Sequence, residues 1–144
     1  VKDDLVAALR SRTKYDVLSA SLRVHAPGCG RANYAYPDAI ITCDEKKFDT
    51  RVSPPTLLNP TILFEVTSES TRRRDTGDKL GAYFRLESLL EYWIVDPERP
   101  QVLRYTRAEN GVLVHLVNGL DQDIRCDALD LSIPMAELYR RVLS

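Results

Sequence analysis

The segment 61–67 carries an acidic residue inside a run that otherwise has the composition of a buried strand. Glu65 is part of the sequence ILFEV, residues 62–66, and a short apolar run of this kind predicts a strand inside a sheet. An ionised carboxylate in an apolar layer is costly unless it is paired with a cation or binds a metal. The rest of the chain must therefore supply a positive charge to Glu65.

Composition favours one soluble globular domain over residues 1–144. The chain is 44% hydrophobic and 28% charged, which is ordinary for such a domain. A chain of this length buries about 68–70% of its unfolded surface, enough for a core without disulfides or metals. The net charge is −1, so bulk charge does not attract polyanions, and any contact with nucleic acid has to be local.

The cysteines and histidines argue against a zinc site and a disulfide framework. Cys29, Cys43 and Cys126 are far apart and form no CxxC pair, which is typical of reduced thiols in a cytoplasmic protein. His25 and His115 give little support to a histidine-based nuclease. No apolar run approaches the roughly 20 residues of a membrane span. We therefore expect a cytoplasmic protein without membrane contact.

The predicted elements are three helices, four strands and a hairpin. We expect helices over 1–12, about 75–87 and 134–141, strands over 17–25, 36–43, 61–67 and 91–97, a hairpin of 101–107 and 111–118, a polar loop over 44–55, and a turn over 68–74. This order predicts an α/β fold, with a mixed sheet flanked by helices and a C-terminal β-hairpin.

A second acidic residue, Asp38, follows a proline where the strand 36–43 begins. If the strands 36–43 and 61–67 are neighbours, Asp38 and Glu65 can converge on one point, where two carboxylates repel unless a cation lies between them. Oxygen ligands alone favour Mg²⁺ or Mn²⁺. Such an ion lowers the pKa of a bound water and stabilises charge on a phosphodiester.

Pro-Asp, a gap and then an acidic strand residue form the nuclease pattern PD…(D/E)xK. The lysine of that pattern would stand two residues after Glu65, where this chain has Thr67. The nearest substitute is Lys79, four residues after Asp75 in the predicted helix. From there a lysine could reach the strand end and neutralise developing negative charge.

Each of these residues also has a purely structural interpretation. Glu65 can pair with a lysine or arginine at the core edge, and an aspartate such as Asp38 is common after proline. Asp75 can cap the helix, and with Lys79 it forms an i,i+4 pair that stabilises a helix by about 0.2–0.5 kcal/mol.

Three further features have two interpretations each. Ser68 is a hydrogen-bonding residue at the strand end, or it holds a metal-bound water. Tyr83, four residues after Lys79, belongs to the core or lends its hydroxyl to the site. A dense basic run contacts phosphate, or it is a solvated loop; its residues are Arg72, Arg73 and Arg74.

Four segments occur in the order and spacing of the Uma-two family: YPDAII, NPTILFEVTSEST, DTGDKLGAYF and SLLEYWIVDPERPQVLRY. From about Leu5 to Tyr139 the chain resembles these bacterial endonuclease-like proteins of the PD-(D/E)XK, restriction-endonuclease-like superfamily. The resemblance implies a restriction-endonuclease-like fold and a divalent metal site. The family usually has a further strand and helix before residue 1, so we expect that an N-terminal segment is missing here.

The resemblance also implies roles for individual residues. Asp38 and Glu65 match the two motif acids, and Lys79 matches the lysine of the following helix. Asp75 and Tyr83 match recurring positions around that lysine. In this superfamily the backbone oxygen after the glutamate often ligates the metal, which here is the carbonyl of Val66.

These observations predict a metal-dependent endonuclease that hydrolyses DNA phosphodiester bonds with Mg²⁺ or Mn²⁺. Asp38 and Glu65 would bind the metal, and Lys79 would orient the attacking water or stabilise the pentacovalent phosphate. The alternative is a catalytically degenerate module that acts in binding or protein interaction, favoured by Thr67 at the lysine position. A homodimer formed at the open edge of the hairpin, strands 101–106 and 111–117, is compatible with either.

Overall fold

The computed structural model describes residues 1–19, 22–27, 34–68 and 79–142. Within them, residues 79–84 are helical, and the other elements are α1 (Lys2–Arg12), β1 (Val17–Ser19), β2 (Arg23–His25), β3 (Tyr34–Ala35), β4 (Ala39–Ile41), β5 (Phe48–Asp49), β6 (Thr56–Leu57), β7 (Ile62–Val66), β8 (Glu91–Val95), β9 (Gln101–Ala108), β10 (Gly111–Asn118), β11 (Asp123–Cys126), β12 (Leu131–Pro134) and α3 (Met135–Tyr139).

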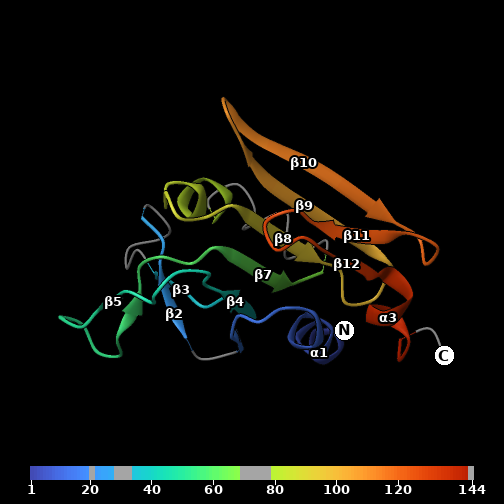
Figure 1. Ribbon diagram of the computed structural model, residues 1–144, viewed down its shortest axis with the longest axis horizontal. Coiled ribbons are helices and arrows are strands. Elements are labelled where there is room, and N and C mark those ends of the chain that lie inside the picture. Colours follow the sequence, from blue (N-terminus) through green and yellow to red (C-terminus); the bar gives the residue numbers. More distant parts are fainter. Residues whose placement is uncertain (20–21, 28–33, 69–78, 143–144) are drawn as a thin grey trace.

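A six-stranded sheet forms the centre of the molecule (Figure 1), with the strand order β1-β4-β7-β8-β9-β10. β7 and β8 are parallel, and the other neighbours are antiparallel. A parallel pair needs a crossover connection, and the one between β7 and β8 contains the helical residues 79–84. The sheet is therefore mixed, with one parallel pair among antiparallel pairs.

Two smaller sheets accompany the central one. β3, β2, β6 and β5 form a four-stranded sheet in that order, and β11 pairs with β12 as a hairpin. In Figure 1 the four-stranded sheet and the hairpin lie at opposite ends of the molecule. The helices α1 and α3 lie next to each other, beside that hairpin.

Each face of the central sheet has its own hydrophobic core, because side chains alternate along a strand. The first core contains Phe64 and Trp93, packed against α1, α3 and the hairpin β11–β12. The second core contains Leu63, Tyr92 and Ile94, packed against residues 80–89 and the four-stranded sheet. Glu65 has the parity of Leu63 and therefore lies on the second face.

The α/β class, the mixed sheet and the hairpin are confirmed, and the arrangement is consistent with a restriction-endonuclease-like fold. The hairpin β9–β10 extends over 101–108 and 111–118. Trp93 is fully buried. Among the described residues, no helix has both the length and the apolar character that crossing a bilayer requires.

The prediction of one strand over 17–25 is wrong. The structure has two short strands there, β1 in the central sheet and β2 in the four-stranded sheet. Leu18 and Val24 do share the second core, while Val17 packs in the first. The alternating pattern indicates which side chains are buried, but it does not indicate which sheet the backbone joins.

The predicted loop over 44–55 and the segment 119–133 contain strands that were not predicted. Phe48 and Asp49 form β5, which pairs with β6, and the hairpin β11–β12 precedes α3. A two-residue strand is too short to show a period. Pro134 precedes α3 as its N-cap, and the helix ends at Tyr139 rather than at residue 141.

Candidate active site around Glu65

Glu65 lies near the C-terminal end of β7, inside the sheet. Its residue is 7% exposed, and it is paired in register with Ile94 of the parallel strand β8. Both strands are largely apolar, so the sheet itself offers little to solvate the carboxylate. The groups that stabilise the negative charge of Glu65 must therefore be side chains that lie over this face of the sheet.

Three side chains donate to the Glu65 carboxylate. The Tyr83 hydroxyl donates to Oε1 at 2.8 Å, and the Tyr92 hydroxyl donates to Oε2 at 2.6 Å. The Lys79 ammonium lies 3.3 Å from Oε1 and 3.5 Å from Oε2. The crossover helix supplies Lys79 and Tyr83 one turn apart, and β8 supplies Tyr92 from the neighbouring strand.

Tyr92 remains a hydrogen-bond donor because its phenol is held in the protonated form. Burial, and next the negative charge of Glu65, raise the pKa of Tyr92 well above its usual value. Tyr92 packs edge-on against Tyr83 and is stacked with Tyr105. The aromatic packing therefore fixes the direction from which the phenol meets the carboxylate.

Asp38 lies just before β4, beside the C-terminal end of β7. The register of β4 and β7 pairs Ala39 with Phe64, and the Asp38 amide donates to the Phe64 carbonyl at 2.9 Å. The Asp38 carboxylate accepts from the amide of Val66, so Asp38 contacts the two residues that flank Glu65. The expectation that the two strands are neighbours is therefore confirmed.

The Asp38 carboxylate is anchored at both oxygens. Oδ2 accepts a hydrogen bond of 2.7 Å from the amide of Val66, and Oδ1 lies 3.7 Å from the ammonium of Lys2 on α1. Each carboxylate of the pair thus has a lysine close to it, Lys2 beside Asp38 and Lys79 beside Glu65. Two positive charges from two helices compensate the two negative charges on paired strands.

Five predicted residues lie around the end of β7: Lys79 and Tyr83 contact Glu65, and Asp38 contacts Val66. Tyr83 combines its two predicted roles, because it is fully buried and also donates to Glu65. Ser68 follows β7 and is half-buried. Four predicted residues lie outside the described residues: Asp75, Arg72, Arg73 and Arg74.

Sequence reasoning missed two residues of this site. Tyr92 had a usable signal, since it stands in a predicted strand beside 61–67, and a polar hydroxyl at that parity could meet Glu65. Lys2 had none: it is one of two lysines near the chain start, and only the packing of α1 places it beside Asp38.

The donor set suits a hard divalent cation. The side chains are carboxylates, and the other candidate is the carbonyl of Val66, so every ligand would be oxygen, as Mg²⁺ and Mn²⁺ prefer. Within the described parts of the chain, no three side chains of His, Cys, Asp or Glu are grouped closely enough to hold an ion. Two carboxylates with backbone oxygen and water still fit Mg²⁺, which keeps several waters when bound.

Comparisons with known proteins find relatives of this chain. Two uncharacterised proteins of Synechocystis sp. are similar to the chain: one is 27% identical over 108 residues, 75% of this chain and 55% of that protein, and the other is 36% identical over 64 residues, 44% of this chain and 36% of that protein. The chain spans about half the length of the first and less of the second. The model of the Uma2 family, described as "Putative restriction endonuclease", matches residues 1–136, and the chain therefore belongs to the Uma2 family.

Proposed function

We propose that this protein is a metal-dependent nuclease that hydrolyses phosphodiester bonds of DNA. The observation that carries the proposal is that Asp38 contacts the amide of Val66, the residue after Glu65 on the neighbouring strand β7, while Lys79 lies 3.3 Å from Glu65. Membership of a family described as "Putative restriction endonuclease" supports the same chemistry.

In this proposal Asp38, Glu65 and the Val66 carbonyl hold Mg²⁺ or Mn²⁺. The bound ion would lower the pKa of a water and stabilise negative charge on the phosphate. Lys79 would orient the attacking water or meet the charge that develops on the pentacovalent phosphate. Its ammonium is partly exposed, so it can contact solvent and Glu65 at once.

The remaining residues of the site position the two acids. Tyr83 and Tyr92 fix both oxygens of Glu65, and the Val66 amide fixes Asp38. Groups held in this way need little rearrangement when a substrate arrives, which is the usual basis of electrostatic preorganisation. Ser68 would hold a metal-bound water, and the run Arg72, Arg73 and Arg74 would contact phosphate.

A second function fits the same contacts. Lys79 and the two tyrosines already satisfy the buried carboxylate of Glu65 without a metal, and Thr67 stands where the motif lysine is expected. A module of this kind would keep the sheet and act in binding or protein interaction. It predicts a stable fold with no response to divalent cations.

Cleavage of supercoiled plasmid and single-stranded DNA in Mn²⁺ tests the first function. The wild-type chain should nick the plasmid, and Lys79→Ala should cut it about 10²–10³-fold more slowly, as the loss of a charge-stabilising group does elsewhere. Glu65→Gln should abolish cutting. Lys14→Ala is the matched control, because Lys14 lies over the Tyr15 ring, whereas the lysines paired with the two acids among the described residues are Lys2 and Lys79.

Equal cutting by wild type and Glu65→Gln would contradict the assignment and point to a contaminating nuclease. A wild-type chain that cuts neither substrate, while its melting temperature ignores Mn²⁺, would support the binding module instead.

A further inference from the structure

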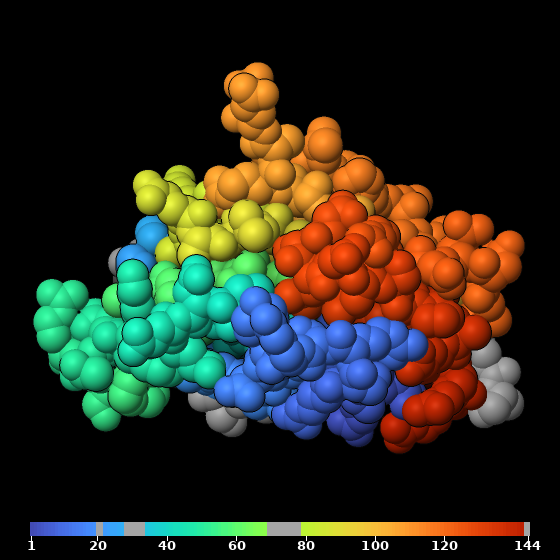
Figure 2. Space-filling view, in the orientation of Figure 1, coloured from blue at the N-terminus to red at the C-terminus, as the bar shows by residue number. Residues whose placement is uncertain are grey.

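The outer strand of the central sheet, β10, is exposed along its length. Among the described strands it pairs only with β9, and seven of its eight residues are exposed. The exposed side chains include Leu113 and Val114, both 56% exposed, and Leu116, 57% exposed. In Figure 2 the hairpin β9–β10 forms the upper border of the molecule, and its turn projects from the surface.

β10 has none of the features that usually protect a sheet edge. Natural edge strands are short, bulged, or carry lysine, proline or inward-pointing charges that prevent pairing with another chain. The sequence of β10 is GVLVHLVN, in which His115 is the one side chain that can carry a charge. Its eight residues pair with β9 in continuous register, without a bulge.

The exposed apolar side chains are continuous with the second face of the sheet. Val114 and Leu116 are paired with Tyr105 and Leu103 of β9, and both of those residues pack against the second core. An apolar stripe therefore leads from the edge strand toward Tyr92, on which Tyr105 is stacked. This stripe lies on the face that carries Glu65.

We propose that β10 pairs with β10 of a second copy of this chain, antiparallel and centred on His115. In this register His115 faces its own copy, Val114 faces Leu116, and Leu113 faces Val117. The sequence of β10 is nearly symmetric about His115, so on each side of the His115 pair two apolar side chains meet two apolar side chains. Because β10 is neutral when His115 is unprotonated, no like charges oppose the contact.

The register has a consequence for the arrangement of the two sites. A two-fold axis perpendicular to the joined sheet keeps both Glu65 faces on the same side. The two copies of β7 would be separated by seven inter-strand spacings of about 4.8 Å, about 34 Å in all. If the proposed nuclease function holds, this separation is close to one turn of B-DNA, about 34–36 Å. The dimer itself does not depend on that function.

Sedimentation velocity over low to high micromolar concentration tests the association. The wild-type 144-residue chain should pass from monomer to dimer, because an interface of one strand pair lies at the small end of specific interfaces. Leu116→Lys places two charges in the apolar contact and should weaken the dimer roughly tenfold or more, as truncation of an interface anchor does. Leu58→Lys is the control, since Leu58 is exposed but follows β6, a strand of the four-stranded sheet.

Disulfide trapping tests the register. Residues directly opposed in an antiparallel pair have Cβ atoms about 4.5–5.5 Å apart, so mild oxidation should link two copies of His115→Cys. Val112→Cys faces Asn118 in this register and should not link. The wild-type chain reports any background from its own cysteines. Both variants change an exposed position, so the fold is retained.

Three results would overturn the proposal. If the wild-type chain stays monomeric, β10 does not pair with a second copy, and its partner would be another protein or a segment outside these 144 residues. A dimer that Leu116→Lys does not weaken would place the interface elsewhere. Linkage of Val112→Cys without linkage of His115→Cys would exclude the register centred on His115.

Discussion

At the scale of single residues, the environment of Glu65 explains how a sheet interior accepts a carboxylate. Hydrogen bonds to charged groups contribute more than neutral ones, about 1.5–3 kcal/mol each. Glu65 receives such bonds from Tyr83 and Tyr92, with Lys79 close to both oxygens. The acid is therefore stable in the folded chain before any ligand binds.

Tyr92→Phe tests the contribution of one of these bonds. The substitution keeps the ring and removes the hydroxyl that lies 2.6 Å from Glu65 Oε2. We expect the free energy of unfolding to fall by about 1.5–3 kcal/mol, because a buried charged acceptor loses its donor. Urea denaturation followed by fluorescence measures it.

Tyr105→Phe is the matched control, because Tyr105 stacks on Tyr92 but is only half-buried. It should change stability by less than about 0.5 kcal/mol, as surface substitutions do. Equal losses in both variants would show that the hydroxyl of Tyr92 has no special role.

The sequence predicted much of this site because chemistry and strand periodicity acted together. Glu65 was conspicuous in an apolar run, and Asp38 stood at the start of another strand. Long-range packing decides which strands lie beside those of Glu65 and Asp38, and which helix ends lie close to these two acids. For that reason Lys2, which contacts an acid 36 positions away, could not be assigned from local pattern.

At the scale of elements, a buried ion pair inside the central sheet also contacts the turn of the hairpin β11–β12. Arg104 of β9 lies 3.1 Å from Glu91 of β8, and both are almost fully buried. Glu91 also accepts from the Ala128 amide at 2.8 Å. Burial, and next the charge of Glu91, raise the pKa of the Cys126 thiol to about 12, so this thiol is protonated at neutral pH.

Arg104→Met should destabilise the fold by about 3–5 kcal/mol, because removal of one partner leaves Glu91 buried without its cation. Thermal or urea unfolding gives the value. Arg125→Met is the control: Arg125 pairs with Asp127 and Asp130 at the surface, where an ion pair contributes about 0–1 kcal/mol. A loss for Arg104→Met no larger than that of the control would contradict the account.

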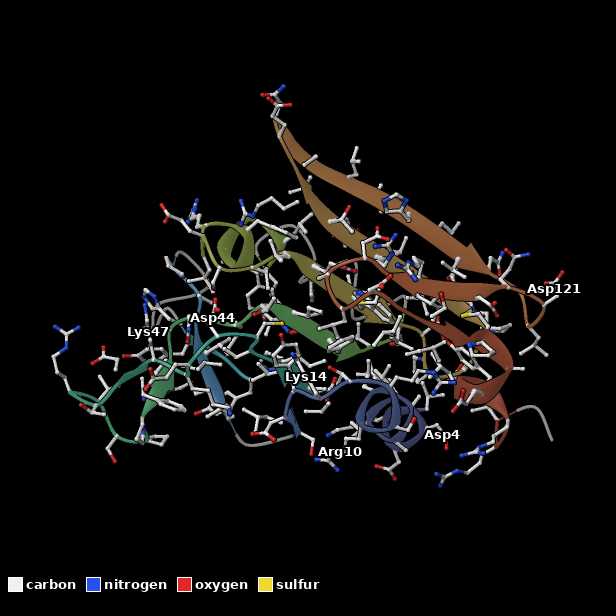
Figure 3. All side chains as sticks on the ribbon, viewed as in Figure 1. Asp4, Arg10, Lys14, Asp44, Lys47 and Asp121 are labelled. Atoms are coloured by element: carbon white, nitrogen blue, oxygen red, sulfur yellow. The ribbon has the colours of Figure 1, made fainter. Side chains whose placement is uncertain are left out.

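A second contact joins the two ends of the chain. Asp4 of α1 is buried and lies 2.9 Å from Arg141 and 3.3 Å from Arg140, just beyond α3. Figure 3 shows Asp4 on the side of α1 that faces α3. Burial raises the pKa of Asp4, but the guanidinium groups of Arg141 and Arg140 outweigh it and lower that pKa below its usual 3.8.

A lowered pKa fixes the sign of the pH dependence. The contact stabilises the fold above pH 3.8, where the unfolded carboxylate is also ionised, and this stability is lost as the pH falls through the lower, folded pKa. For Asp4→Asn, the free energy of unfolding should therefore fall less steeply between about pH 4 and pH 2 than it does for wild type. Urea midpoints across this range measure it, and identical slopes for wild type and variant would rule out the contact as the cause.

Long elements with strong periods were predictable, and short ones were not. β7, β8 and the hairpin β9–β10 carry apolar runs or a clear turn, and the structure confirms them. β3, β5 and β6 have two residues each, and their pairing depends on neighbours far away in the sequence. The break between β1 and β2 lies inside one alternating run for the same reason.

At the scale of the whole molecule, the central sheet packs against different elements on its two faces. On its first face, α1, α3 and the hairpin β11–β12 pack to form an apolar core. This core joins α1, at the start of the chain, to α3, near its end. Its second face carries Glu65, the crossover helix and the apolar stripe that leads to β10. The proposed catalytic glutamate and the proposed dimer contact therefore both involve the second face.

Calorimetric titration with Mn²⁺ tests whether Asp38 and Glu65 hold a divalent cation, as we propose. Metal binding does not depend on choosing the correct nucleic acid, so a negative result is informative. We expect that wild type binds Mn²⁺ and that Asp38→Asn and Glu65→Gln, each still folded, do not. A wild-type chain without binding, or variants that bind as wild type does, would contradict the proposal.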